Sequence, residues 1–255
     1  MFKKRFVITI GDSRVGKSTV SRLLLDLYKT HDLNIRAFYH GQRPDGLSNK
    51  LSSYNRLGFN VRHLGLNRGD SDILLNELEM FSEIDLVLTD MPGQNLLDFF
   101  IFDKEISFLE NLNCLGYRAT FIHPISNRRD CVNYLQSLYQ VVDNKADYLV
   151  IKNCYFGDSF KYYDGTKIQE HVNKLNGIEM ILPKIEDYVY QDLEDTNLPY
   201  SIAITTESDM QLLYRSVVFN WIESCHQIII NHDIAPVYLG LKINRAELTH
   251  QQSYF

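Results

Sequence analysis

The sequence has only four cysteines in 255 residues, and no two of them form a C-x-x-C pair. Structural zinc sites and redox motifs need closely spaced cysteines, and a disulfide framework needs a higher density of them. Neither is therefore expected. We expect the cysteines to be core residues of a protein in a reducing compartment; they are Cys114, Cys131, Cys154 and Cys225.

The sequence also lacks an apolar run long enough to span a bilayer. Its N-terminal basic residues run directly into the glycine-rich motif described below, so we expect no removable signal peptide. Positive charge is not in excess. A net charge of −6 gives no general attraction to nucleic acid, although local basic pairs such as Arg128-Arg129 remain. We expect a soluble, cytoplasmic protein with no membrane span.

Internal repeats and low-complexity segments are absent too. A chain of this length with 45% apolar residues can bury the core of one large α/β domain. We expect a single nucleotide-binding domain over residues 1–241. The polar residues 242–255 are expected to form a flexible tail.

The most specific feature present is the segment Gly11–Thr19, GDSRVGKST, which fits the phosphate-binding loop G-x-x-x-x-G-K-[ST]. It follows the strand-like run Phe6–Ile10 and precedes apolar residues at helical spacing from Ser18 onward. In such a loop the backbone N–H groups surround phosphates, and the dipole of the following helix adds positive potential. The segment therefore predicts a nucleoside triphosphate site.

Two residues of this loop have specific expected roles. Lys17 would contact the β- and γ-phosphates, and Ser18 would ligate Mg²⁺. The alternative is an ordinary glycine turn, which the Lys-Ser pair disfavours. The residues expected to surround the phosphates are Gly11, Asp12, Ser13, Arg14, Val15, Gly16, Lys17, Ser18 and Thr19.

A carboxylate for the metal is expected at Asp90, which ends the hydrophobic run Ile84–Thr89 and begins the sequence D-M-P-G-Q. Gly93 would offer its amide to the γ-phosphate. Gln94 would order the attacking water, as the corresponding glutamine does in GTPases. With Lys17, Asp90 and Gln94 are the candidate catalytic residues, although Asp90 could instead be a turn residue.

Asn153 ends another expected strand, Tyr148–Lys152, and its amide is suited to an adenine edge. The guanine-specific pattern N-K-x-D is not met, because the order here is Lys152-Asn153 and the next aspartate is Asp158. ATP is therefore predicted rather than GTP. The alternative for Asn153 is a turn former at a strand end.

Strand-like and helix-like segments alternate along the chain, which predicts an α/β fold with a mainly parallel sheet flanked by helices on both faces. A polar loop is expected over Gly41–Asn49. The expected strands are Phe6–Ile10, Leu33–His40, Val61–Leu66, Ile84–Thr89, Arg118–His123, Tyr148–Lys152, Glu179–Leu182 and Tyr200–Thr205. One expected helix begins at Ser18. The other expected helices are Ser71–Phe81, Phe102–Leu115, Asp130–Val142, Thr166–Leu175 and Asp209–Asn231.

With these motifs in order, the chain resembles the ParA/MinD group of P-loop ATPases (SIMIBI/ParA-like), and within it the MobD- and StbB-like proteins of plasmid mobilisation and stability. The resemblance is carried by Gly11–Thr19, Asp85–Gln94, Tyr148–Asn153 and Ile181–Lys184. It implies a proline-containing loop, here with Pro183, beside the adenine. It also implies a slow ATPase acting as a nucleotide switch, with a nucleotide-dependent homodimer and a protein adaptor that links it to DNA.

The sequence departs from this group at two places. Asp12 stands where the group carries a signature lysine that reaches the partner's nucleotide, and Arg14 is the candidate replacement for that charge. Tyr39 and His40 stand where the group has an aspartate after the second strand. Two alternatives to the switch therefore remain: a small-molecule kinase or dethiobiotin-synthetase-like ligase of the same fold, and a nucleotide-dependent binding module with little turnover.

Overall fold

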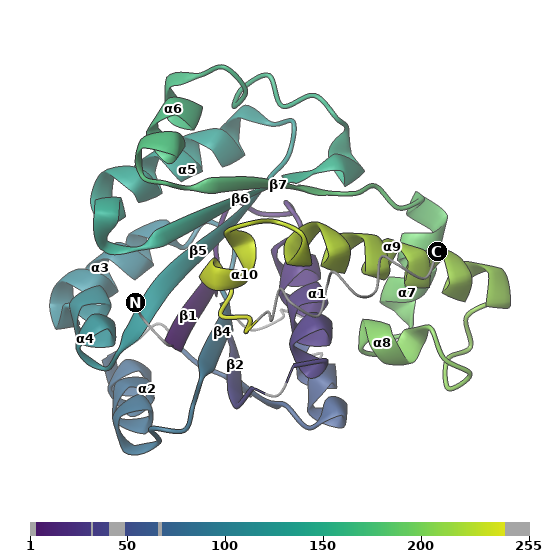
Figure 1. The fold of residues 1–255 in the computed structure, drawn as a ribbon, viewed down its shortest axis with the longest axis horizontal. Helices are drawn as coiled ribbons and strands as arrows, with labels where there is room; N and C mark the ends of the chain where they lie inside the picture. Colours follow the sequence, from purple (N-terminus) through teal and green to yellow (C-terminus); the bar gives the residue numbers. More distant parts are fainter. Residues whose placement is uncertain (1–3, 32, 41–48, 66–67, 243–255) are drawn as a thin grey trace.

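The computed structural model describes residues 4–31, 33–40, 49–65 and 68–242. Seven strands form one sheet in the order β3-β2-β4-β1-β5-β6-β7, and every neighbouring pair is parallel (Figure 1). The predicted α/β fold with a parallel sheet is therefore confirmed. The strands are β1 (Lys4–Thr9), β2 (Ile35–Tyr39), β3 (Asn60–His63), β4 (Leu86–Asp90), β5 (Tyr117–Ile125), β6 (Asp147–Asn153) and β7 (Ile178–Leu182).

Helices cover both faces of this sheet (Figure 1). One face packs against α1 (Lys17–Lys29), α7 (Asp187–Asp195), α8 (Tyr200–Ala203), α9 (Leu212–Ile230), α10 (Ala235–Tyr238) and the 3₁₀-helix η1 (Lys50–Leu57). The other face packs against α2 (Arg68–Met80), α3 (Leu96–Ile106), α4 (Phe108–Cys114), α5 (Arg129–Val142) and α6 (Lys167–Lys174). Short 3₁₀ segments follow α5 and β6, at η2 (Asp143–Lys145) and η3 (Cys154–Phe156).

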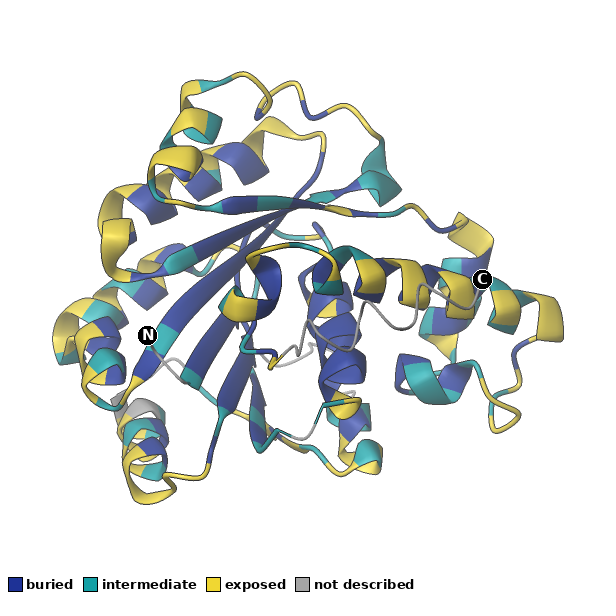
Figure 2. Ribbon diagram, viewed as in Figure 1, coloured by how far each residue is buried: buried dark blue, intermediate teal, exposed yellow. Residues whose placement is uncertain are grey.

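The central strands are buried on both sides (Figure 2). Because successive side chains of a strand point to opposite faces, Val7 of β1 belongs to the core under α1, whereas Phe6 and Ile8 belong to the core under α3 and α4. β1 pairs with β4 so that Thr9 lies beside Asp90. This register brings the phosphate loop and the predicted metal carboxylate to the same edge of the sheet.

Two expected elements differ in the structure, and one helix was not expected. The segment predicted as a strand from Tyr200 is the short helix α8, whose Tyr200 and Ser201 backbone N–H groups donate to side chains outside it. The helix predicted over Phe102–Leu115 is two helices, because Ser107 has a left-handed backbone with a φ of 49°. Helix α7 was not predicted.

Cys131 and Cys225 are buried as expected, but Cys114 is exposed. Residues 41–48 of the expected polar loop and residues 243–255 of the expected tail lie outside the described residues. In the part of the chain that is described, no helix combines the length and the hydropathy that crossing a membrane requires.

Candidate nucleotide site

The segment between β1 and α1 has the strand, loop and helix order of a phosphate-binding loop. Gly16 precedes the helix in a left-handed conformation with a φ of 97°. A Cβ atom at this position would lie 2.5 Å from Nδ2 of Asn153, so only glycine fits without movement. The second glycine of the motif is therefore explained by the packing of the loop.

Lys17 is buried at the first turn of α1, and its Nζ donates a hydrogen bond to the backbone oxygen of Asp12 at 2.6 Å. Burial lowers the pKa of Lys17, while the carboxylates of Asp90 and Asp12 act in the opposite direction. A buried ammonium group at the start of a helix favours an anion beside it. This is the arrangement predicted for the cation that contacts the phosphates.

Ser18 and Asp90 meet at the same place. Oγ of Ser18 donates to Oδ2 of Asp90 at 2.7 Å, and Oγ of Ser21 donates to the other carboxylate oxygen at 3.3 Å. Burial raises the pKa of Asp90, because a carboxylate removed from water loses solvation. A nearby cation would stabilise its charged form.

A hydroxyl and a carboxylate oxygen are ligands that suit Mg²⁺, which takes one or two protein groups and completes its shell with water and phosphate oxygens. Across the described ranges no cluster of three or more His, Cys, Asp or Glu residues forms a metal cage. Ser18 and Asp90 therefore fit a magnesium ion that arrives with a nucleotide better than an ion bound by the protein alone.

The loop after β4 lies directly on the phosphate loop. A Cβ atom on Gly93 would lie 2.4 Å from Oγ of Ser13, so this approach requires glycine. The next residue, Gln94, has a left-handed backbone with a φ of 65°, and its side-chain amide donates to Oδ1 of Asp12 at 3.1 Å. Gln94 is thus held at the phosphate loop, and its role in ordering water stays a prediction.

Asp12 is neutralised inside its own chain. Its Oδ2 lies 3.0 Å from Nη2 of Arg128, which also donates to the backbone oxygen of Ser13 at 2.6 Å. The expected replacement cation, Arg14, is exposed and has a left-handed backbone with a φ of 58°. The cation that accompanies Asp12 is therefore Arg128, which sequence analysis noted only as part of a basic pair.

A cleft of about 180 Å³ has Thr19 in its wall, and aromatic side chains line much of it. Tyr190 of α7 packs against Tyr155 with 5.5 Å between ring centroids and against Trp221 with 6.4 Å. The hydroxyl groups of Tyr190 and Thr19 are 2.5 Å apart. These three aromatic residues were not predicted as site residues, because they are far apart in the sequence and fit no motif.

Asn153 and Pro183 also line this aromatic cleft. The Asn153 amide donates to the backbone oxygen of Val15 at 3.0 Å and accepts from the N–H of Tyr155 at 3.1 Å. The carbonyl of Pro183 accepts from Nε1 of Trp221 at 2.8 Å. The structure brings both predicted residues to the cleft, and their contacts with adenine stay predictions.

A second cleft of about 340 Å³ lies beside Lys17 and Ser18 and is more polar. Glu194 of α7 forms ion pairs there with the buried Arg22 of α1 and with Lys50 at the start of η1. Residues of α1, α7 and η1 therefore line this polar cleft. Arg14, Gly16, Thr19 and Tyr190 line both clefts, so the two adjoin.

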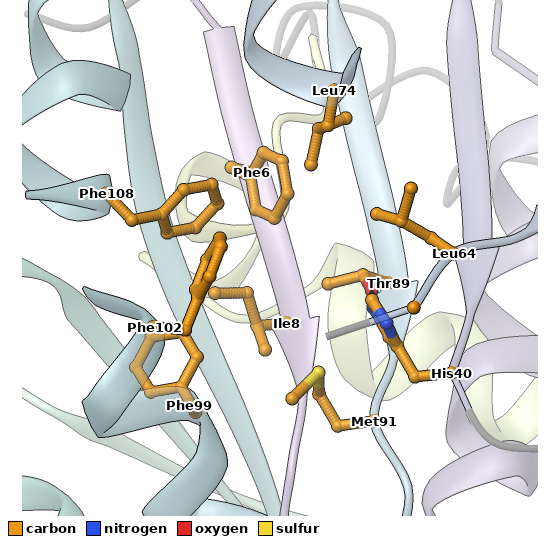
Figure 3. A pocket seen from close by; sticks show the side chains of 11 residues that line it. Phe6, Ile8, His40, Leu64, Leu74, Thr89, Met91, Phe99, Phe102 and Phe108 are labelled. Carbon is orange, nitrogen blue, oxygen red and sulfur yellow. Dashed lines mark hydrogen bonds between the residues drawn. The ribbon is translucent and has the colours of Figure 1, made fainter. Parts of the chain in front are cut away.

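His40 lies outside the two clefts beside the phosphate loop. Its ring contacts the hydroxyl of Thr89, beside a cavity of about 20 Å³ with mostly apolar walls (Figure 3). Asp90 is the next residue of β4, so its side chain points to the opposite face of the sheet. Burial lowers the pKa of His40 to about 4. A general base for water at the phosphates would have to come from another residue.

No protein-family description matches this sequence, and no curated protein does. Among solved structures, the chain is similar to MinD of the MinC:MinD cell division complex of Aquifex aeolicus, with 11% identity, a TM-score of 0.49, and 86% of this chain and 96% of that chain covered. MinD of Aquifex aeolicus alone gives 13% identity, a TM-score of 0.46, and coverage of 87% and 96%. The signal recognition particle receptor FtsY of Elizabethkingia anophelis in complex with GDP gives 12% identity, a TM-score of 0.46, and coverage of 70% and 57%. Identities this low assign no activity to this chain.

Proposed function

We propose that this protein binds ATP with Mg²⁺ and hydrolyses it slowly, as a nucleotide switch. The proposal rests on one observation: the buried Lys17 and the hydrogen-bonded pair Ser18 and Asp90 lie together at the start of α1. A buried cation supplies charge for phosphates, and the pair supplies oxygen ligands for their metal.

The bound nucleotide would lie across the start of α1. Its phosphates would occupy the loop, with the terminal phosphate towards Gly93 and Gln94. Its base would enter the aromatic cleft between Tyr155 and Trp221, where planar rings pack well. Mg²⁺, when bound, would neutralise phosphate charge, while Asp90 and Ser18 hold it in place.

The cellular role that we propose is the partitioning, mobilisation or positioning of plasmid DNA or another cargo through a protein adaptor. It rests on the resemblance to MobD- and StbB-like members of the ParA/MinD group. In such a role ATP binding and hydrolysis change which partner the protein holds. A binding module with little turnover would use the same site without the hydrolysis step.

A titration of ATP and GTP with and without Mg²⁺, followed by an assay of phosphate release, tests this function. We expect ATP to bind more tightly than GTP, Mg²⁺ to strengthen binding, and phosphate release to be slow. Equal affinity for both nucleotides would overturn the adenine assignment. The absence of binding by either would overturn the proposed site.

The polar cleft beside Lys17 favours a second candidate, phosphate transfer to a small molecule. Its volume of about 340 Å³ would hold a small acceptor, with Lys50 and Arg22 in its wall. A kinase or ligase would release or transfer phosphate only when its acceptor is present. Phosphate release in the absence of any acceptor favours the switch instead.

A further inference from the structure

The carboxylate of Asp12 joins three loops at the edge of the sheet. It accepts from the N–H of Ser13 in the phosphate loop at 2.7 Å, from the amide of Gln94 after β4 at 3.1 Å, and pairs with Arg128 after β5. Asp12 itself is buried, whereas the Arg128 side chain is 45% exposed. An anion therefore occupies the place where these three donors converge.

The position of Lys17 identifies which end of the nucleotide this place would face. In a phosphate-binding loop the lysine contacts the β- and γ-phosphates. Here the Lys17 ammonium group donates to the backbone oxygen of Asp12, the residue whose carboxylate pairs with Arg128. The base, in the proposed function, would lie in the aromatic cleft. Arg128 therefore lies at the terminal-phosphate end.

We propose that Arg128 recognises the terminal phosphate of a bound nucleoside triphosphate, and that Asp12 holds its guanidinium group beside the phosphate loop. This rests on the proposed function and adds to it a residue that distinguishes triphosphate from diphosphate. The charge comes from the same chain, at the residue that precedes α5, so recognition needs no second subunit.

The chemistry of the guanidinium group suits this role. It is planar, permanently charged and carries five N–H donors, so it can bind a carboxylate and a phosphate together. Nη2 is held by Asp12 and Ser13, and Nε lies 3.4 Å from Oγ of Ser126, which orients the plane. A diphosphate would be too short to reach a group at this end. A triphosphate would gain a charge-assisted contact there.

The test is calorimetric titration with Mg²⁺ and either ADP or the non-hydrolysable analogue AMP-PNP. The variants are Arg128→Gln and Arg128→Lys, with Arg129→Gln, at the first residue of α5, as the matched control. Circular dichroism establishes that each variant is folded. We expect Arg128→Gln to weaken AMP-PNP binding by about tenfold or more and to leave ADP binding unchanged.

Arg128→Lys should recover only part of this loss, because an ammonium group lacks the planar fork. Arg129→Gln should bind both nucleotides as the parental protein does. If Arg128→Gln weakens ADP and AMP-PNP equally, or affects neither, the assignment of Arg128 is wrong and the nucleotide site stands. If the parental protein binds neither nucleotide, the proposed function itself fails.

Discussion

The hydroxyl group of Ser18 donates a hydrogen bond to the carboxylate of Asp90 at 2.7 Å, which joins the first turn of α1 to the end of β4. The two residues are distant in the sequence, but their side chains are in contact in the fold. Their side chains present oxygen atoms to one point beside the phosphate loop, and this pair is where we expect nucleotide-bound Mg²⁺.

Replacement of Asp90 by asparagine should abolish Mg²⁺-dependent hydrolysis and weaken nucleotide binding less. The amide keeps the shape of the side chain and can accept from Ser18, but it loses the negative charge that holds the cation. Phosphate release measured over a range of Mg²⁺ concentrations checks this. Asp98→Asn, an exposed carboxylate in the first turn of α3, is the control. A parental rate in Asp90→Asn would move the metal role to another carboxylate.

Trp221 should report nucleotide binding by fluorescence. It is the only tryptophan of the chain and lines the aromatic cleft, so a base that enters the cleft changes its surroundings. We expect a saturable change in emission with ATP, and the same titration with inorganic triphosphate should leave emission nearly unchanged. Nucleotide binding by calorimetry with no change in emission would place the base elsewhere.

The part of the site that follows a local pattern could be predicted from the sequence. Gly16, Lys17 and Ser18 were predicted because phosphate binding fixes their spacing, and Asp90 because it ends a hydrophobic run. The pairing of Asp12 with Arg128 could not be predicted, because it depends on how the loops after β1 and β5 meet. No spacing in the chain encodes that contact.

The aromatic cleft was missed for a related reason. Helix α7 buries only Val189 and Leu193, so its apolar pattern is too sparse to indicate a helix, and Tyr190 was not placed. The segment from Tyr200 has β-branched residues typical of a strand, but the side chains of Asp26 and Tyr54 bind its backbone in a helical turn. Tertiary contacts therefore override its local preference.

Acid should destabilise the protein through His40. Burial lowers the pKa of His40 from 6.5 to about 4, so between these values the unfolded chain binds more protons than the folded one. The contribution of the neutral His40 side chain to the free energy of unfolding is fully present above about pH 6.5 and is lost as the pH falls towards 4. His63 lowers this pKa further and Asp70 raises it.

We therefore expect the parental protein to lose about 1.4 kcal/mol of unfolding free energy per pH unit relative to His40→Asn over this range. Urea denaturation of both proteins at pH 7 and pH 5 measures the difference. A difference in unfolding free energy that is the same at both pH values would mean that His40 titrates normally in the folded state.

ATP alone should produce little stable homodimer of this protein. The cation near Asp12 is Arg128 of the same chain, and Arg14 is the exposed cation of the phosphate loop. With Mg²⁺ and AMP-PNP, light scattering should therefore give a mass near 29.8 kDa for both the parental protein and Arg14→Ala. A tight dimer in the parental protein that Arg14→Ala disrupts would show that Arg14 acts across subunits.

The central claim is that the loop from Gly11 to Thr19 binds the phosphates of ATP through Lys17. Calorimetric titration of Mg²⁺-ATP into the parental protein, Lys17→Ala and the control Lys29→Ala, at the far end of α1, tests it most directly. We predict saturable binding by the parental protein and Lys29→Ala, and an affinity lower by about tenfold or more in Lys17→Ala, which loses a buried charge-assisted contact. Unchanged affinity in a folded Lys17→Ala protein would contradict the claim.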